Sequence, residues 1–208
     1  MQEKILVFDM GNVLISFDTH RILADQGLNE EEIVLFEDTV FRSPEWRGYD
    51  QGVCGKDAFE RPISALPPKL SALARKMILE TVFVSSYMPP FPQTEELVRR
   101  AKDAGYRLYL LSNAGQDFYQ YRSGIPALTL FDGLYVSSDY KLLKPEREIY
   151  LSFLRTFSLR AEDCVFIDDM QVNIDGAAAV GMDGICFNAA REPIETLYRK
   201  LAEKGVVI

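Results

Sequence analysis

Ile5-Leu6-Val7-Phe8-Asp9 is the stretch of sequence that decides the fold. Four apolar residues in a row, with no polar residue between them, are typical of a strand in a parallel sheet that is buried on both faces. The acid that follows would lie at the carboxyl edge of such a sheet, where open parallel sheets bind their ligands. The stretch therefore predicts both the fold class and the edge of the sheet where a site should lie.

Strand and helix patterns alternate along the C-terminal part of the chain. Apolar runs and helical spacings predict strands at 106–111, 133–136, 164–167 and 184–187 and helices at 94–104, 116–121, 146–157, 172–180 and 192–204. Such alternation is typical of a doubly wound, mainly parallel α/β sheet of Rossmann-like form, with helices on both faces.

Residues 18–88 interrupt this alternation. They contain no convincing strand pattern, and their apolar residues recur at helical spacings that proline and glycine divide into four or five helices. Pro89-Pro90-Phe91-Pro92 marks the end of the interruption. We therefore predict a core domain of residues 1–17 and 89–208, with a small helical cap domain of residues 18–88 inserted after the first strand.

The balance of charges excludes several classes of partner. The 208 residues include 31 Asp and Glu against 23 Lys and Arg, which gives a formal charge of −8. No run of basic residues offsets this charge, so we expect no nucleic-acid partner and no binding to an anionic membrane surface. The sequence gives no indication of an oligomeric state.

The sequence also predicts a cytoplasmic protein. Met1-Gln2-Glu3-Lys4 leads directly into the first strand, which leaves no room for the apolar core of a signal peptide, and no apolar run is long enough to span a membrane. Cys54, Cys164 and Cys186 are odd in number and scattered, which is typical of reduced packing residues.

Polar side chains follow the predicted strands at the points where the strands end. They are Asp9, Ser112, Asn113, Asp168 and Asp169, together with Lys144 in a loop before a predicted helix. Because the carboxyl ends of parallel strands share one edge, we expect these groups to converge. An aspartate that ends a strand is also commonly a turn former or a helix cap, so each of these residues alone has a structural alternative.

Phosphoryl transfer is the chemistry that such a set would serve. Mg2+ binds carboxylate and carbonyl oxygens and usually takes only one or two carboxylates from the protein. An adjacent carboxylate can attack phosphorus, while an ammonium and hydroxyl or amide donors neutralise the charge on the phosphoryl oxygens.

In this order the residues resemble the haloacid dehalogenase-like hydrolases. The four motifs of that family are matched by Val7-Phe8-Asp9-Met10-Gly11-Asn12-Val13-Leu14, by Leu111-Ser112-Asn113, by Lys144-Pro145, and by Phe166-Ile167-Asp168-Asp169 with Asn173 and Gly181 downstream. The resemblance spans the whole chain, and it places a helical cap between the first and second motifs, as in the smaller capped members of the family.

The resemblance implies a role for each of these residues. Asp9 would be the nucleophile that forms an aspartyl-phosphate, and Lys144 would balance charge on the nucleophile and the phosphate. Ser112 and the amide of Asn113 would hold the phosphoryl oxygens. The ligands of Mg2+ would be Asp9, the backbone carbonyl of Gly11 and Asp169, with Asp168 in support directly or through water. Lys141 is a nearby and weaker candidate for the role of Lys144.

Gly11 departs from the family pattern. Phosphatases of this family usually carry a second Asp at this position, which donates a proton to the leaving group. Such a proton donor typically contributes about 10²- to 10⁴-fold to the rate. A leaving group of low basicity, such as the anomeric hydroxyl of a sugar 1-phosphate, needs this help least, and the form of the first motif also resembles a bacterial branch that includes alpha-glucose-1-phosphate phosphatases. Asp18 is a conceivable substitute acid, although a surface or capping role is the simpler interpretation.

The cap would choose the substrate. A loop-like stretch beside Gly52 offers side chains that could meet a sugar or could equally be ordinary cap surface, namely Trp46, Arg47, Tyr49, Asp50 and Gln51. His20 is the only histidine, and we expect it on the surface of a helix.

The leading hypothesis is a Mg2+-dependent phosphatase that acts on a small phosphorylated metabolite, such as a sugar phosphate. Three alternatives stay open: a 2-haloacid dehalogenase, which needs no metal; a non-catalytic protein that binds a phosphorylated metabolite; and a mutase.

Overall fold

A five-stranded parallel sheet forms the centre of the computed structural model, which describes residues 4–80 and 82–208. Its strands are β1 (Ile5–Phe8), β2 (Arg107–Ser112), β3 (Gly133–Val136), β4 (Cys164–Asp168) and β5 (Asp183–Cys186), in the order β3-β2-β1-β4-β5. The prediction of a doubly wound α/β sheet is therefore confirmed. The prediction about the N-terminal segment rests on residues 1–3, which lie outside the described part of the chain.

The central strand β1 is buried on both faces, as its apolar run predicted. Phe8 is in register with Leu110 of β2 and with Ile167 of β4. The backbone N–H of Asp9 continues the ladder, donating to the carbonyl of Ile167 at 2.8 Å. This register brings the ends of the three middle strands, and the polar residues that follow them, to one edge of the sheet.

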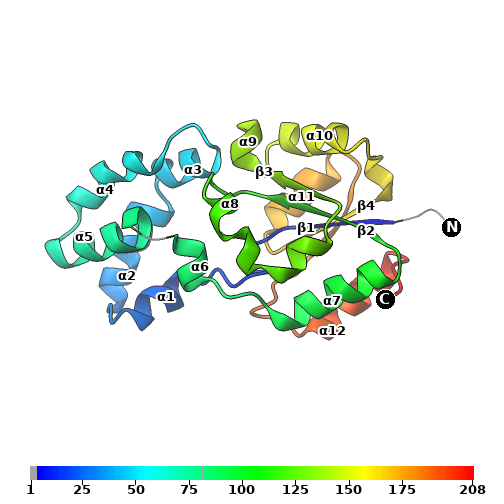
Figure 1. Cartoon of the computed structure of the whole chain (residues 1–208), viewed down its shortest axis with the longest axis horizontal. Helices are drawn as coiled ribbons and strands as arrows, with labels where there is room; N and C mark the ends of the chain where they lie inside the picture. The colour runs from blue at the N-terminus through cyan, green and yellow to red at the C-terminus, as the bar shows by residue number, and fades with distance from the viewer. Residues whose placement is uncertain (1–3, 81) are drawn as a thin grey trace.

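Helices cover both faces of the sheet (Figure 1). They are α7 (Pro92–Asp103), α8 (Phe118–Tyr121), α9 (Ser137–Tyr140), α10 (Arg147–Thr156), α11 (Gln171–Ala178) and α12 (Ile194–Glu203). Side chains of α7 and α12 pack with Leu6 and Phe8 on one face, whereas those of α10 and α11 pack with Ile5 and Val7 on the other. The short helix α9 was not predicted, because four residues are too few to show a helical period.

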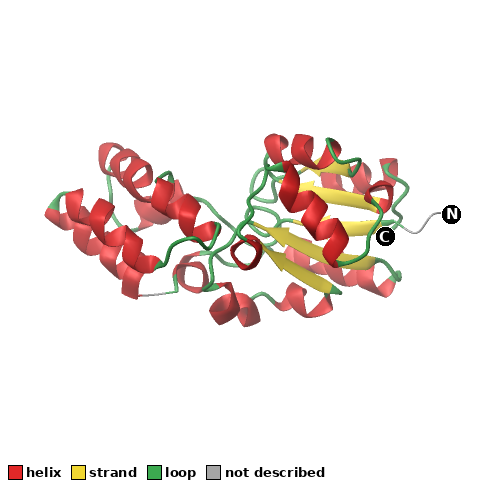
Figure 2. Ribbon diagram, turned by 90° about the horizontal axis from the view of Figure 1, so that it is seen from above, coloured by secondary structure: helices red, strands yellow, loops and turns green. Residues whose placement is uncertain are grey.

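The segment between β1 and α7 is helical and lies beyond the carboxyl ends of the strands (Figure 2). Its α-helices are α1 (Thr19–Asp25), α2 (Glu30–Phe36), α3 (Pro44–Asp50), α4 (Glu60–Ala65), α5 (Pro68–Ala74) and α6 (Phe83–Tyr87). Short π or 3-10 turns lie in this segment at Glu37–Phe41, Lys56–Phe59 and Arg75–Glu80, and in the rest of the chain at Arg122–Gly124, Pro126–Leu130 and Ala161–Asp163. We refer to the helical segment between β1 and α7 as the cap, and its division from the core at residues 18 and 88 stays a prediction.

The prediction that the stretch around Trp46 is loop-like is wrong, because this stretch forms helix α3. The Ser43 side chain caps this helix by accepting a hydrogen bond from the N–H of Trp46 at 3.1 Å, and Pro44 occupies the first turn. Both are ordinary start signals of a helix. Gly48, inside the helix, weakened the periodic pattern but is buried in the structure.

Two further findings bear on the expectations from composition. In the ranges 4–80 and 82–208, no helix combines the length and the apolar character that a membrane crossing requires. Cys54, Cys164 and Cys186 are all free thiols, and Cys164 is buried in the core.

One buried polar atom in the first turn of α7 allows a test of the packing. Thr94 is fully buried, and its hydroxyl has no hydrogen-bond partner among the described residues. Because Val has the same shape without the hydroxyl, we expect Thr94→Val to raise the free energy of unfolding by about 1 kcal/mol in a urea titration. Thr129→Val is the matched control, since the Thr129 hydroxyl donates to the carbonyl of Pro126 at 2.7 Å and its loss should not stabilise the protein. A destabilised Thr94→Val variant would contradict this account.

Candidate active site

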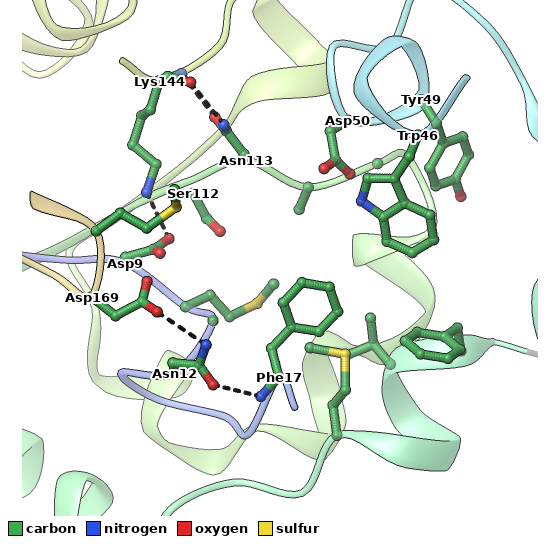
Figure 3. Close-up of a pocket in the computed structure, with 18 of the residues that line it drawn as sticks. Asp9, Asn12, Phe17, Trp46, Tyr49, Asp50, Ser112, Asn113, Lys144 and Asp169 are labelled. Carbon is green, nitrogen blue, oxygen red and sulfur yellow. Dashed lines mark hydrogen bonds and ion pairs between the residues drawn. The ribbon is translucent and has the colours of Figure 1, made fainter. Parts of the chain in front are cut away.

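A cavity of about 270 Å³ lies at the carboxyl edge of the sheet, between the sheet and the cap. The core contributes polar groups to its wall, including Asp9, Ser112, Asn113, Lys144 and Asp169. The loop after β1 contributes Phe17, and the cap contributes mainly apolar groups, including Trp46, Tyr49, Phe83, Val84 and Met88. Figure 3 shows the polar side chains of the core on one side of the cavity and the aromatic groups on the other. The convergence of polar groups expected from the strand ends is therefore present.

Asp9 lies at the floor of the cavity and is largely buried. Its Oδ1 forms an ion pair with Lys144 Nζ at 2.8 Å. Burial raises the pKa of Asp9 to about 7; the charge of Lys144 opposes this shift, and the charge of Asp168 adds to it. The carboxylate is thus held next to one cation in a place that disfavours negative charge.

Lys144 is buried and shared by two carboxylates. Its Nζ lies 2.8 Å from Asp9 Oδ1 and 2.7 Å from Asp168 Oδ2. Burial by itself lowers the pKa of Lys144, but the charges of Asp168 and Asp9 outweigh it, so the pKa lies above its usual value. The ammonium is therefore charged and fixed between the two carboxylates.

Asp168 is fully buried and makes several other hydrogen bonds. Its Oδ1 accepts from the N–H of Met170 at 2.8 Å and from Asn173 Nδ2 at 2.9 Å. Its Oδ2 accepts from Lys144 and, at 3.0 Å, from Asn173. These donors occupy both oxygens, so the direct effect of Asp168 in this structure is to hold Lys144.

Asn113 fixes the loop that carries Lys144. Its Oδ1 accepts from the N–H of Lys144 at 2.9 Å, and its Nδ2 donates to the carbonyl of the same residue at 3.1 Å. Only the backbone amide of Asn113 was assigned a role from the motif, because a side-chain contact with a residue 31 positions away has no signal in a local motif. Ser112, the preceding residue, is buried and lines the cavity.

Three acids form a group that could hold a metal ion. Asp9, Asp168 and Asp169 each offer a carboxylate oxygen within 4.8 Å of the others. Hard cations such as Mg2+ bind sets of oxygen donors of this kind. Burial raises the pKa of Asp169, while a hydrogen bond from Asn12 opposes that shift.

Asn12 positions Asp169 and was not assigned a role from the sequence. Its Nδ2 donates to Asp169 Oδ2 at 3.0 Å, and its Oδ1 accepts from the N–H of Phe17 at 2.9 Å. Its backbone has a φ of 53°, in the left-handed region that Asn tolerates better than most residues. Asn188 makes a second, longer hydrogen bond to the same carboxylate oxygen, at 3.3 Å.

Comparison with known proteins agrees with this arrangement. The model of the haloacid dehalogenase-like hydrolase family matches residues 3–181. The chain belongs to this family. Sesquiterpene phosphatase astK of Aspergillus oryzae is 28% identical over 191 residues, which are 88% of each protein. Phosphatase MT3486 of Mycobacterium tuberculosis is 26% identical over 229 residues, which cover 100% of this chain and 98% of that protein.

The fold of this haloacid dehalogenase-like hydrolase also has solved counterparts. A magnesium complex of the HAD family enzyme bt-2542 from Bacteroides thetaiotaomicron superposes with a TM-score of 0.70 at 20% identity, covering 96% of this chain and all of that one. The family expected from the motifs is therefore confirmed. The branch suggested by the first motif is not distinguished by these similarities.

In this hydrolase, position 11 has no side chain that could donate a proton. Gly11 lines the cavity, and a Cβ at this position would lie 3.8 Å from Cβ of Phe17. Asp18 is exposed and caps α1 by accepting from the N–H of Arg21 at 3.0 Å. It does not line the cavity, so the capping interpretation of Asp18 holds and the substitute-acid interpretation does not.

The remaining candidates divide between the cavity and the surface. Lys141 Nζ binds the carbonyls of Gly52 and Ser138, which leaves Lys144 as the lysine of the cavity. Arg47 pairs with Glu146 at 2.6 Å, and Gln51 donates to the carbonyl of Lys141. Of the cap residues singled out from the sequence, Trp46, Tyr49 and Asp50 line the cavity. His20 contacts Glu30 on the surface at 3.0 Å, as expected of a helix-surface residue.

Removing the support of Asp169 tests the assignment of the acidic group. We expect Asn12→Ala to weaken Mg2+ binding by about 10- to 100-fold, because groups that orient a metal ligand typically contribute that much to affinity. Isothermal titration with MgCl2 measures the effect. Asn188→Ala should give a smaller loss, since its hydrogen bond is longer, at 3.3 Å against 3.0 Å. Equal affinity in Asn12→Ala and the unmodified protein would show that the Asn12 hydrogen bond does not support a metal ligand.

Proposed function

We propose that this hydrolase is a Mg2+-dependent phosphatase, which cleaves a small phosphorylated metabolite through an aspartyl-phosphate on Asp9. One observation carries the proposal: Lys144 is ion-paired to both Asp9 and Asp168, and Asp169 completes the acidic group beside them. An anionic floor that already holds one fixed ammonium needs a further cation before it can accept a phosphate dianion.

The carboxylate of Asp9 attacks phosphorus in this mechanism. Lys144 holds that carboxylate in place at 2.8 Å and neutralises part of the charge on the phosphoryl oxygens. Ser112 and the amide of Asn113 donate to the same oxygens, and water then hydrolyses the aspartyl-phosphate. The oxygen of Asp9 that attacks must be one that Lys144 does not occupy. Lys144 contacts Oδ1 of Asp9.

The residues fit the metal that this mechanism requires. Asp9, the carbonyl of Gly11 and Asp169 would hold Mg2+, and Asp168 would support it through Lys144 or through water. When bound, Mg2+ supplies positive charge to the phosphoryl group and so reduces its repulsion from the three carboxylates.

Two classes of substrate follow from the cavity wall. A sugar 1-phosphate fits the missing acid at Gly11, and Tyr49 and Asp50 offer polar partners for sugar hydroxyls. An organic phosphate with an apolar alcohol is the second candidate, because Phe17, Phe83 and Met88 form an apolar wall. The similarity to a protein named as a sesquiterpene phosphatase supports the second class.

The nucleophile is tested by Asp9→Asn. We expect phosphate release to fall at least about 10³-fold, since an amide cannot form the covalent intermediate. Excess chelator should abolish release by the unmodified protein, and added MgCl2 should restore it. Mass spectrometry of acid-quenched protein should detect one added phosphoryl group on the peptide with Asp9. Turnover that survives either change would refute the mechanism, and halide release from a 2-haloacid in chelator would identify a dehalogenase instead.

The substrate class is tested by a panel of sugar 1-phosphates, sugar 6-phosphates and isoprenoid monophosphates. Release of phosphate with the highest kcat/KM from sugar 1-phosphates would support the first class, and from isoprenoid phosphates the second. Phe83→Ser is a matched probe of the apolar wall, and it should raise KM for the isoprenoid phosphates by about tenfold, a loss typical of apolar groups in a pocket. Tight binding of a panel member without release would identify a binding protein.

A further inference from the structure

Asp50 is a cavity carboxyl that the mechanism above does not use. It is the last residue of α3 in the cap, and it lines the same cavity as Asp9 and Ser112. Figure 3 shows its carboxyl directed into the cavity, across from Asp9 and Ser112. The indole nitrogen of Trp46 lies beside this carboxyl in Figure 3.

The end of α3 is pressed against the core, which fixes the place of Asp50. The carbonyl of Asp50 accepts a hydrogen bond from Ser137 Oγ at 2.5 Å, and the same hydroxyl accepts from the N–H of Ala114 at 2.9 Å. Ala114 directly follows Asn113. One serine therefore connects the backbone of Asp50 to the segment that carries the expected phosphate-binding groups.

Two glycines allow this close approach. A Cβ at Gly115 would collide with the ring of Tyr49, and a Cβ at Gly52 would collide with the carbonyl oxygen of Ser138. Gly52 also has a φ of +69°, which favours glycine. The contacts on both sides of Asp50 show that its position belongs to the junction of cap and core, and not to a free surface of the cap.

We propose that Asp50 is the proton donor to the leaving group, in place of the carboxyl that position 11 lacks. The inference rests on the proposed phosphatase function. As Asp9 bonds to phosphorus and the bond from phosphorus to the leaving oxygen breaks, the proton of the Asp50 carboxyl passes to that oxygen. In the second step the Asp50 carboxylate takes a proton from the attacking water, whose oxygen bonds to phosphorus and releases Asp9. Asp50 thus ends each cycle protonated and Asp9 ionised.

The charges around Asp50 suit this role. Burial, together with the negative charges of Asp117 and Asp9, raises the pKa of Asp50 to about 7, and the indole N–H of Trp46 opposes this shift. Tyr121 faces it from α8, and Tyr49 precedes it on its own helix. On the neighbouring α9 side, Lys141 Nζ is bound to carbonyl oxygens.

Asp117, the other cap-facing carboxyl of the cavity, already has a charged partner. Its Oδ2 forms an ion pair with Lys56 Nζ at 3.4 Å. Asp117 is thus held against a cation of the cap, whereas the carboxyl of Asp50 is directed into the cavity. Asp117 is therefore a control residue of the same charge in the same cavity.

The test compares p-nitrophenyl phosphate with phenyl phosphate, which have similar shapes but leaving groups of very different basicity. In Asp50→Asn we expect kcat/KM for phenyl phosphate to fall about 10²- to 10⁴-fold, whereas that for p-nitrophenyl phosphate stays within about threefold. Asp50→Glu, which keeps an acid, should fall less on phenyl phosphate. Asp117→Asn keeps the donor, so at a pH well below 7 the ratio of the two kcat/KM values should stay close to that of the unmodified protein. Loss of the Asp117 charge should only move the fall of the ratio to lower pH.

The pH dependence of that ratio gives a second measurement, in which ionisations shared by both substrates cancel. Only protonated Asp50 donates, so in the unmodified protein the ratio of phenyl to p-nitrophenyl phosphate should fall as the pH rises through about 7. The ratio should be flat with pH in Asp50→Asn. Thermal melts of each variant check that it is folded.

Other outcomes would overturn the proposal. Equal losses on both substrates in Asp50→Asn, or a rise in KM with kcat unchanged, would show that Asp50 only binds substrate or supports the cavity. Formation of the phosphorylated Asp9 peptide would then still support the proposed function. Failure of the unmodified protein with Mg2+ to hydrolyse either phosphate would refute the proposed function, and the role of Asp50 with it.

Discussion

The ammonium of Lys144, buried between Asp9 and Asp168, is the interaction on which the rest of the site depends. Two buried carboxylates this close would repel each other strongly without a cation between them. The parallel register of β1 and β4 places both aspartates at one edge of the sheet, and Asn113 holds the loop that brings the lysine to them. Sheet topology, loop position and site electrostatics therefore support one another.

Much of this architecture could be predicted from the sequence because it depends on short periodic patterns. The run before Asp9 and the run before Asp168 are apolar and uninterrupted, and the position of an acid directly after such a run fixes where it lies in a parallel sheet. The helix predicted at 94–104 is α7, and Gly105, with a φ of +88°, follows its end as glycine commonly does. The fold class and the meeting of the strand-end residues follow from these local rules.

What the sequence could not predict depends on contacts between distant segments. The two hydrogen bonds between the Asn113 side chain and the Lys144 backbone join residues with no shared period or motif. The same holds for the hydrogen bond of Asn12 to Asp169 and for the ion pair of Asp117 with Lys56. The helical form of α3 was obscured for a different reason, since Gly48 is a poor helix former whose burial is decided by tertiary packing. From the sequence, Asp50 was therefore only one residue of a loop-like stretch that could meet a sugar or could equally form ordinary cap surface.

The two halves of the proposed chemistry come from different parts of the chain. The nucleophile belongs to the sheet, and the proposed proton donor belongs to a helix that reaches the sheet only where Tyr49 lies on Gly115 and Gly52 on Ser138. A ligand so bulky that α3 could not stay packed against the core would still contact Asp9, but Asp50 would no longer be in place to donate its proton. The fit of cap to core would therefore select substrates by size through the rate of the chemical step. A poorly fitting phosphate would bind but would leave before its phosphorus–oxygen bond is broken.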